Sequence, residues 1–378
     1  MRPSATFATF AVLSLAASST AVRALVRVVA RALARVVVDA LAARSLAWLI
    51  AIPLVWPLAA QAQAVTLKTS SWLPASHPLT RSQAKWCDEV EQATSMRVRC
   101  SALPRPVSPP PGTFDAVRDG LADLSFSVHA YTPGRYPITQ IAELPFAGTT
   151  AEAASRAWQR IFARHLAALN DHRGLKVIAV FTHGPGQICN ARRPVASLAD
   201  MEGLRFRVDG GTVSDIGKAI GVTVVMKPAS ETLELLGSGA IDGTFSPAES
   251  ISSLRLEKAI HHCTIVPGGL YNTSFAFVMN QAAWERISKT DQAAIERLSG
   301  EHAAMLFGRA WDQADRRGIA LLQASGVRAI VAGRAFVDEI RARAAPLEHK
   351  WVVDAKARGV ADPEQVLREF RAEAARLR

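Results

Sequence analysis

The chain has 378 residues, of which 49% are hydrophobic and 20% charged, and it is long enough to form two lobes. Its formal net charge is +11, but beyond residue 64 the basic residues are interleaved with acidic ones. No basic run alternates with aromatic side chains, as single-strand binders require, so nucleic acid is not an expected partner.

The first 64 residues have the pattern of an export signal. A mostly apolar run over residues 46–60 follows Arg44, and small-x-small cleavage sites end at Ala62 and Ala64. The run is short, and such a site follows it too soon, for a membrane span. We therefore expect cleavage near Ala64 and a periplasmic mature protein.

The alanine-, valine- and arginine-rich tract of residues 1–42 is more than a secretion signal needs. It is either a long basic leader or an extension created by a start codon placed too far upstream. We favour the extension, with the true start near Val38, Leu41 or Leu46. A membrane-surface or organelle-targeting segment is a third interpretation.

From residue 65 the hydrophobic pattern alternates between the period of strands and the period of helices. Strands are expected over residues 65–71, 97–103, 123–128, 175–181, 204–208, 243–246, 273–279 and 327–331. Helices are expected over residues 80–94, 113–120, 150–169, 212–220, 230–236 and 284–314, with two or three more between 334 and 378. Residues 104–111 are rich in proline and predict an extended loop. The alternation predicts an α/β fold.

One phrase occurs twice. Residues 120–127 and 239–246 share the pattern G-x-x-D-x-[ST]-F-S, and each copy follows an amphipathic helix. The repetition predicts two similar helix–turn–strand units in two similar lobes, with Ser127 and Ser246 at strand ends facing one cleft. Chance is the alternative, because helix–Gly–Asp–strand connections recur in α/β proteins.

The most informative strand is residues 203–211, with the sequence GLRFRVDGG. Apolar and polar residues alternate along it, and a glycine pair separates it from the next helix. Ligand crevices of α/β proteins lie at such an edge. Arg207 stands there, and its planar fork of donors can bind a carboxylate with two parallel bonds. We predict that Arg207 holds an anionic ligand; a surface ion pair at the strand end is the alternative.

Four cysteines, Cys87, Cys100, Cys189 and Cys263, follow the export signal. After export Cys87 could pair with Cys100 and Cys189 with Cys263, while buried free thiols are the alternative. None has metal-ligand spacing. Residues 261–263 read His-His-Cys, but adjacent residues of a strand point to opposite faces and do not converge on one ion.

Catalytic motifs are missing from the sequence. Residues 211–218 approach a phosphate-binding loop, but the spacing is one residue too long and Ala219 stands where a hydroxyl must bind magnesium. Neither a G-x-S-x-G elbow nor an H-E-x-x-H helix occurs. We therefore expect a binding protein without chemistry, metal or cofactor.

The chain resembles a known family on several of these motifs. Residues 198–208, LADMEGLRFRV, match the signature of the DctP family, the periplasmic solute-binding subunits of tripartite ATP-independent periplasmic (TRAP) transporters. Further matching segments are residues 131–135 before 143–146, residues 239–243, and residues 275–280 followed by Trp284. They occur in the expected order, and the resemblance covers nearly all of residues 65–330.

This resemblance implies a two-lobed, type II periplasmic-binding-protein-like fold with a ligand cleft between the lobes and long connecting helices. The first lobe would combine residues 65–183 and 275–317, and the second residues 184–274 and 318–378. A small organic acid, a carboxylate, would be captured by lobe closure and passed to TRAP-type membrane permease subunits. Some relatives pair through a long helix, so a homodimer is an alternative to a monomer.

The resemblance also assigns individual residues. The arginine with which the family binds a carboxylate falls on Arg207. An asparagine typical of sialic-acid binders falls on Ser246, and their second basic residue falls on Gly186. The chain therefore departs from the sialic-acid subgroup.

We add further candidates from the chemistry that a carboxylate needs. Neutral donors could come from Ser246, Gln187 and Asn272, and an apolar body could pack on Trp72, Phe245 and Tyr131. His129 either bonds to a ligand oxygen or caps its strand. The alternatives are core packing for the aromatic residues and loop capping for the amides. A periplasmic enzyme on the same scaffold and a receptor that feeds a sensor protein are the competing functions.

Overall fold

The computed structural model describes residue 24 and residues 26–33, 64–148 and 150–377. The chain divides into two compact units, residues 1–61 and 62–378, and only the second is considered below. The predicted export signal lies almost wholly outside the described residues, so its cleavage near Ala64 and the true start codon stay predictions. Within the described part of the chain, no helix is both long and apolar enough to cross a membrane.

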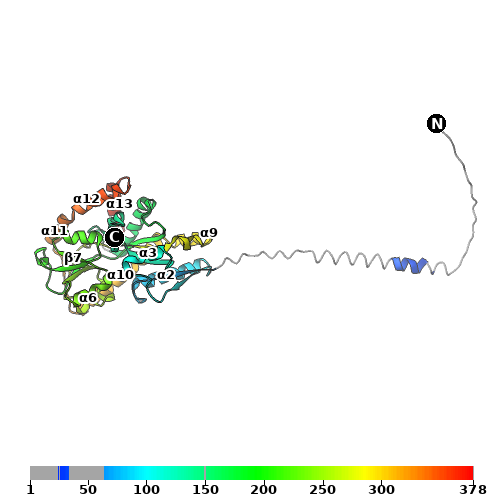
Figure 1. Ribbon diagram of the computed structural model, residues 1–378, viewed down its shortest axis with the longest axis horizontal. Coiled ribbons are helices and arrows are strands. Elements are labelled where there is room, and N and C mark those ends of the chain that lie inside the picture. Colours follow the sequence, from blue (N-terminus) through cyan, green and yellow to red (C-terminus); the bar gives the residue numbers. More distant parts are fainter. Residues whose placement is uncertain (1–23, 25, 34–63, 149, 378) are drawn as a thin grey trace, which may run out of the picture. The chain divides into compact units, whose positions relative to one another are not determined.

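The first lobe is built on a five-stranded sheet in the order β2-β1-β3-β10-β4. β1 is parallel to β2 and β3, whereas β10 is antiparallel to both of its neighbours. The strands are β1 (Val65–Thr69), β2 (Val98–Ala102), β3 (Leu124–Val128), β4 (Leu175–Thr182) and β10 (Ser274–Asn280). Its helices include α2 (Pro78–Ala93), α3 (Thr113–Arg118) and α4 (Ala151–Ile161). Figure 1 labels two of these helices, α2 and α3.

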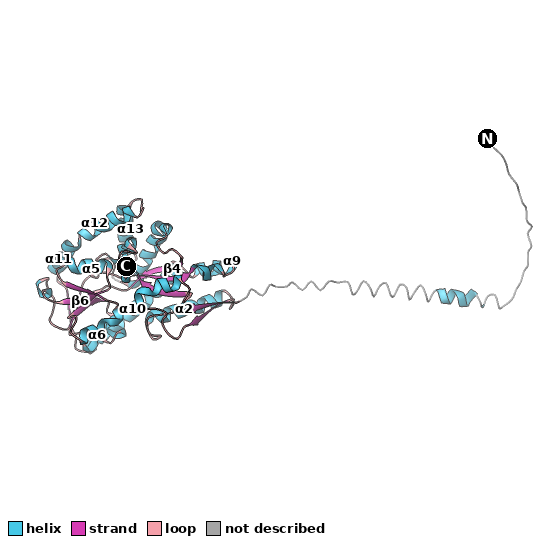
Figure 2. Cartoon of the chain, viewed as in Figure 1, coloured by secondary structure: helices cyan, strands magenta, loops and turns pink. Residues whose placement is uncertain are grey.

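The second lobe is built on a six-stranded sheet in the order β11-β9-β5-β8-β6-β7. Its strands are β5 (Gln187–Asn190), β6 (Arg205–Val208), β7 (Thr223–Met226), β8 (Gly243–Ser246), β9 (His262–Ile265) and β11 (Arg328–Val331). Its helices are α5 (Gly211–Ala219), α6 (Thr232–Gly237), α7 (Glu249–Ser253) and α11 (Arg334–Ala344). Figure 2 shows the strands in two groups surrounded by helices. Two mixed sheets with helices confirm the predicted α/β class.

The repeated phrase forms the same local structure in each lobe. Each copy joins a helix to a strand, α3 to β3 and α6 to β8. In the first, the Asp123 carboxylate accepts a 2.7 Å bond from the backbone of Lys68 on β1. In the second, the Asp242 carboxylate accepts a 3.0 Å bond from the backbone of Arg205 on β6. The repeat therefore marks two equivalent helix–turn–strand units, as predicted.

Helix α10 (Glu301–Ala324) belongs to both lobes. Phe307 and Trp311 lie in the core of the first lobe, and Leu322 lies in a cluster of the second. Two glycines allow this close packing. A Cβ on Gly308 would lie 2.6 Å from Cα of Glu152, and a Cβ on Gly318 would overlap the carbonyl oxygen of Ala248.

The long helical region expected over residues 284–314 is divided into three helices. The structure has α8 (Gln281–Glu285), α9 (Lys289–Arg297) and α10 instead. Helix α9 begins after Ser288, whose side chain accepts from the backbone of Asp291, and Gly300, at φ 59°, precedes α10. The apolar pattern continues across these breaks because all three helices contribute side chains to the core of the first lobe.

The last two helices, α12 (Pro346–Ala357) and α13 (Pro363–Arg376), pack on the first lobe. Trp351 and Phe370 share a core cluster with Trp158 of α4, and the Trp351 indole donates to the carbonyl of Ile138 at 3.0 Å. The resemblance grouped residues 318–378 with the second lobe. Strand β11 and helix α11 do lie there, whereas α12 and α13 contribute side chains to a core cluster of the first lobe.

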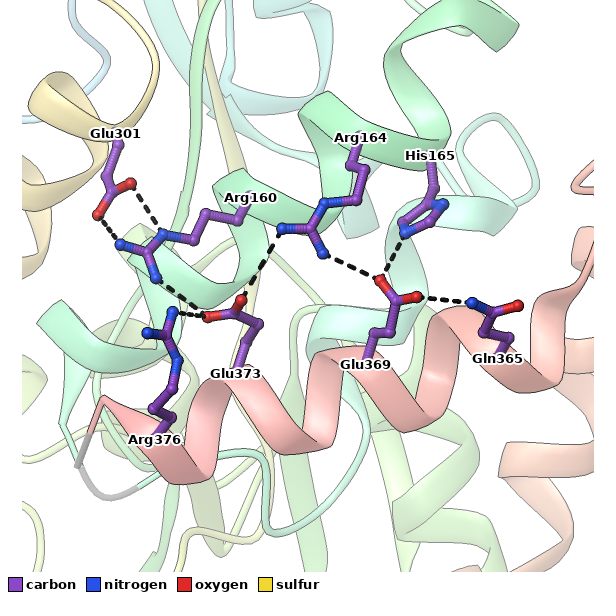
Figure 3. Close-up of polar contacts among 8 residues, drawn as sticks. All are labelled: Arg160, Arg164, His165, Glu301, Gln365, Glu369, Glu373 and Arg376. Carbon is purple, nitrogen blue, oxygen red and sulfur yellow. Dashed lines mark hydrogen bonds and ion pairs between the residues drawn. The ribbon is translucent and has the colours of Figure 1, made fainter.

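A network of ion pairs fastens α13 to the end of α4 and the turn after it (Figure 3). Arg160 bridges Glu301 and Glu373, at 2.7 and 3.0 Å. Glu369 accepts from His165 at 2.8 Å and from Arg164 at 3.0 Å. Bonds from His165, Gln365 and Arg164 lower the pKa of Glu369 to about 2.

We expect Glu369→Gln to lower the free energy of unfolding by less than about 1 kcal/mol at pH 7, because solvent screens the ion pairs of Glu369 with Arg164 and His165. Urea titration at low and high salt measures this. The difference from wild type should shrink as salt rises. A loss above about 2 kcal/mol that salt does not change would show that the network carries stability beyond ordinary surface ion pairs.

Both cysteine pairs are disulfides. Cys87–Cys100 joins α2 to β2, and Cys189–Cys263 joins the adjacent strands β5 and β9. The described residues include no free cysteine. The pairings weighed from the sequence are therefore those of the structure, and Cys263 has no thiol left for a metal.

Candidate ligand-binding site

A cavity of about 40 Å³ lies between the two lobes. The first lobe contributes Trp72, His77, Val128, Tyr131 and Phe275, the second contributes Arg207, Asp209, Ser246, Glu249 and Tyr271, and Trp311 comes from α10. Such a volume corresponds to a few water molecules. An organic acid can therefore enter only when the lobes or the wall side chains separate.

Arg207, at the end of β6, is the strongest candidate for ligand binding. The side chain is 2% exposed. Its Nε donates to the carbonyl of Lys227 at 2.8 Å and its Nη2 donates to Asp209, while Nη1 takes part in neither bond. Burial lowers the pKa of Arg207, but the Asp209 charge and the neighbouring tyrosines raise it more, so the group stays cationic.

The alternative of a surface ion pair describes Arg205 rather than Arg207. Arg205 lies on the same face of β6 and pairs with Asp242 at 3.0 Å, with its side chain 40% exposed. Arg207 does pair with Asp209, but that pair is buried in the cavity wall. Asp209 is itself held by the Thr273 hydroxyl, which donates to it at 3.0 Å.

Ser246 is the second predicted residue at the cavity. It ends β8, and its buried Oγ has no hydrogen-bond partner among the described residues. An unpaired buried hydroxyl is costly, so a ligand partner would satisfy it. Ser127, its counterpart in the repeat, donates instead to the carbonyl of Pro110 at 3.0 Å and is not part of the wall. The expectation that both serines face the cleft is therefore wrong for Ser127.

Aromatic rings make up much of the remaining wall. Trp72 and Tyr131 pack edge to face, with ring centroids 5.9 Å apart. The Tyr131 hydroxyl accepts from the backbone of Ala229 at 3.1 Å and so bridges the lobes. The Tyr271 hydroxyl donates to the carbonyl of Phe245 at 2.8 Å. These rings leave apolar faces for the body of a ligand.

Tyr271 also accounts for the departure at Gly186. A Cβ on Gly186 would overlap the Tyr271 ring. A basic side chain at residue 186 is therefore incompatible with this position of the Tyr271 ring.

Four predicted site residues lie outside the cavity wall. Phe245 packs in the second-lobe core against Phe206, with centroids 4.9 Å apart. Gln187 donates to the carbonyl of Pro185 at 3.0 Å and accepts from Val266 at 2.6 Å. Asn272 donates to the carbonyl of His183 at 2.7 Å. The core and loop-capping alternatives describe these three residues, and their contact with a ligand has no support from the geometry.

His129, the fourth, belongs to a buried histidine pair. Its Nδ1 lies 2.9 Å from the Ser274 hydroxyl and its Nε2 lies 2.8 Å from Nε2 of His172. Burial lowers the pKa of His129 well below the ordinary value, and burial lowers that of His172 to about 3. Both rings are therefore neutral near pH 7.

This pair predicts a loss of stability in acid. The histidines take up protons near pH 6.5 when unfolded but resist protonation when folded, so the free energy of unfolding falls as pH drops below 6.5. Each histidine contributes up to about 1.4 kcal/mol per pH unit, down to its folded pKa. Urea titrations from pH 7 to pH 5 measure the slope. An NMR midpoint above pH 6 for either ring in the folded protein would contradict the prediction.

Several wall residues were not among the candidates. Asp209 had a signal, because it lies two residues after Arg207 and shares its face of the strand. Tyr271, His183 and Glu249 had none, since loops and the short helix α7 bring them to the cavity. His183 accepts from the backbone of Thr273 at 3.1 Å through Nε2, which holds it in one neutral tautomer.

Comparison with known proteins agrees with this architecture. Residues 69–353 match the DctP family model, described as bacterial extracellular solute-binding protein, family 7. A TRAP periplasmic solute-binding protein from Bordetella bronchiseptica, solved with bound (R)- and (S)-mandelate, is 41% identical. The match has a TM-score of 0.81 and covers 83% of this chain and 100% of that one.

Two further solved structures are similar. A TRAP solute-binding protein from Rhodoferax ferrireducens with copurified benzoate is 27% identical, with a TM-score of 0.76, over 83% of this chain and 98% of that one. A marine metagenome TRAP solute-binding protein specific for aromatic acid ligands, with 3-hydroxybenzoate, is 30% identical. Its TM-score is 0.76, over 83% of this chain and 99% of that one.

The family match covers well over half of the chain, and the solved relatives share its two-lobed type II fold. Members of this family are transport receptors that bind their solute without converting it. The chain therefore belongs to the DctP family of periplasmic solute-binding proteins of TRAP transporters.

Proposed function

We propose that the protein captures a small carboxylic acid with an aromatic or apolar body and delivers it to a TRAP-type membrane permease. The observation that carries this proposal is a buried arginine in the wall of an inter-lobe cavity. Arg207 donates from Nε to Lys227 and from Nη2 to Asp209, and its Nη1 takes part in neither bond. A carboxylate stripped of water needs such a charged donor.

The cavity wall supports the aromatic part of the proposal. Trp72, Tyr131, Tyr271, Phe275 and Trp311 surround the space beside Arg207. Flat rings of a ligand pack well on such faces. Mandelate, benzoate and 3-hydroxybenzoate, the acids bound by the similar solved proteins, each combine one carboxylate with a ring.

Lobe closure supplies the binding mechanism. The wall comes from both lobes, and α10 is embedded in both. An acid that touches both walls stabilises the closed form relative to an open one. The permease partner follows from the family, and a homodimer stays a prediction.

A thermal-shift screen of residues 62–378 tests the proposal. The panel contains aliphatic, hydroxy-, oxo-, aromatic and dicarboxylic acids, with the matching alcohols and amides as uncharged controls. An acid at about 100 times its Kd adds about 2.7 kcal/mol of stability, which raises the melting temperature by several degrees. A shift with aromatic acids but not with their amides supports the proposal. Equal shifts with acids and amides would contradict it.

A further inference from the structure

The cavity wall carries a second polar group besides the Arg207–Asp209 pair. His77, from the first lobe, meets Glu249, from the second, with Nε2 and Oε1 3.0 Å apart. Their side chains are 5% and 2% exposed, and both line the cavity. Ser246, with its unpaired hydroxyl, lies in the same wall three residues before Glu249.

His77 is held in one orientation. Its Nδ1 accepts from the backbone of Leu79 at 3.2 Å, where it caps the start of α2. Since Nδ1 is an acceptor, Nε2 is the protonated nitrogen, and it faces Oε1 of Glu249, which has no hydrogen-bond partner among the described residues. The Trp311 ring packs edge-on against the imidazole, with centroids 6.1 Å apart.

Glu249 is held from the opposite side. Its backbone N–H donates to Asp315 of α10 at 2.8 Å, and its Oε2 accepts from the Ser250 hydroxyl at 3.3 Å. A carboxylate has about four acceptor sites. Ser250 occupies one of them, and Oε1 has no hydrogen-bond partner among the described residues, so Glu249 can accept a further hydrogen bond from a group in the cavity.

We propose that Glu249, oriented by His77, binds a hydroxyl group of the ligand, so that the preferred ligands are hydroxylated monocarboxylic acids. This inference rests on the proposed function and specifies its ligand. The ligand hydroxyl donates to Glu249 while the ligand carboxylate lies on Arg207, and Ser246 can bond to either oxygen. An acid with a bare ring offers Glu249 no donor.

The same group excludes a second carboxylate. Glu249 and Asp209 are both acidic and both line the cavity. A dicarboxylate would bring another negative charge against Glu249 in a desolvated space, where repulsion between like charges is strong.

Two matched pairs of acids test the inference by titration calorimetry: mandelate against phenylacetate, and 3-hydroxybenzoate against benzoate. Each pair differs by one hydroxyl. We expect at least one hydroxylated acid to bind about tenfold more tightly than its partner, the effect of one charge-assisted hydrogen bond. Succinate should not bind.

Glu249→Gln keeps the side-chain shape but removes the charge, and should reduce the ratio of Kd values to below about threefold. If Glu249→Gln does not fold, Ser246→Ala is the second variant. It is a smaller change and should also reduce the ratio of Kd values. The matched control is His302→Ala. His302 forms a similar pair, 2.7 Å from Glu89, with a side chain 40% exposed and outside the cavity. That variant should keep the wild-type ratio.

The outcomes separate the inference from the proposed function. If all four acids bind and each pair has equal Kd values, the inference is wrong and the proposed function stands. If none of the acids binds, the inference is wrong, and the aromatic ligand in the proposed function is wrong with it. A wild-type preference that survives in both Glu249→Gln and Ser246→Ala would also overturn the inference, because the hydroxyl would then be bound elsewhere.

Discussion

Replacing Arg207 with alanine should weaken the binding of an aromatic carboxylic acid by at least about 100-fold. Removing one partner of a buried charge pair costs about 2–5 kcal/mol of binding energy, and 2.7 kcal/mol is a factor of 100. Titration calorimetry of wild type and variant against the acid with the largest thermal shift measures the loss. The variant should lose affinity for the acid but keep its affinity for the uncharged amide.

The same substitution leaves Asp209 buried without its partner, which destabilises the fold by about 3–5 kcal/mol. The double variant Arg207→Met with Asp209→Asn removes both charges, so lost binding cannot be attributed to a stranded carboxylate. Arg205→Ala is the matched control, because Arg205 lies on the same face of β6 but pairs with Asp242 outside the cavity wall. Binding lost equally in Arg205→Ala would refute the specific role of Arg207.

Gly318→Ala should destabilise the protein by about 1–3 kcal/mol and weaken ligand binding. Its new Cβ would overlap the carbonyl oxygen of Ala248, a backbone atom that cannot move without shifting α7. That shift would disturb the bond from Glu249 to Asp315 and the wall that Glu249 forms. Denaturant titration and calorimetry of the same preparation measure both effects.

Gly237→Ala is the control for the change of residue type. Gly237 ends α6 and has nothing within 4 Å of the position of a Cβ. Alanine there should stabilise the protein by up to about 1 kcal/mol, because glycine is the poorer helix former. If both variants change the free energy of unfolding in the same direction, crowding between α10 and α7 does not explain the effect of Gly318→Ala.

The sequence predicted the elements whose patterns are long or chemically distinct. Strand β6, its arginine and the glycine pair were recognisable because alternation, charge and turn residues coincide. The repeat around Asp123 and Asp242 was also recognisable, since each aspartate belongs to the same short motif and accepts a bond from the backbone of the neighbouring strand. Strands β5 and β7, with the sequences QICN and TVVM, were missed because four residues hold few periods and, unlike β6, neither strand has charged residues that alternate with apolar ones.

Much of the site could not be predicted because it depends on how the lobes meet. Tyr271 and Glu249 reach the cavity through connections and a short helix whose positions no local pattern specifies. Phe245 looked like a ligand contact because it neighbours Ser246, but successive strand residues point to opposite faces and it lies in the core. His129 looked like a polar group at a strand end, and its partner His172 is 43 residues away in sequence.

A crystal structure of the protein with the acid that gives the largest thermal shift would test the central claim most directly. We predict closed lobes around the acid, with its carboxylate within hydrogen-bond distance of Arg207 and its body against Trp72 and Tyr271. A ligand bound in this cavity with its carboxylate away from Arg207, or one bound only outside the cavity, would contradict the account.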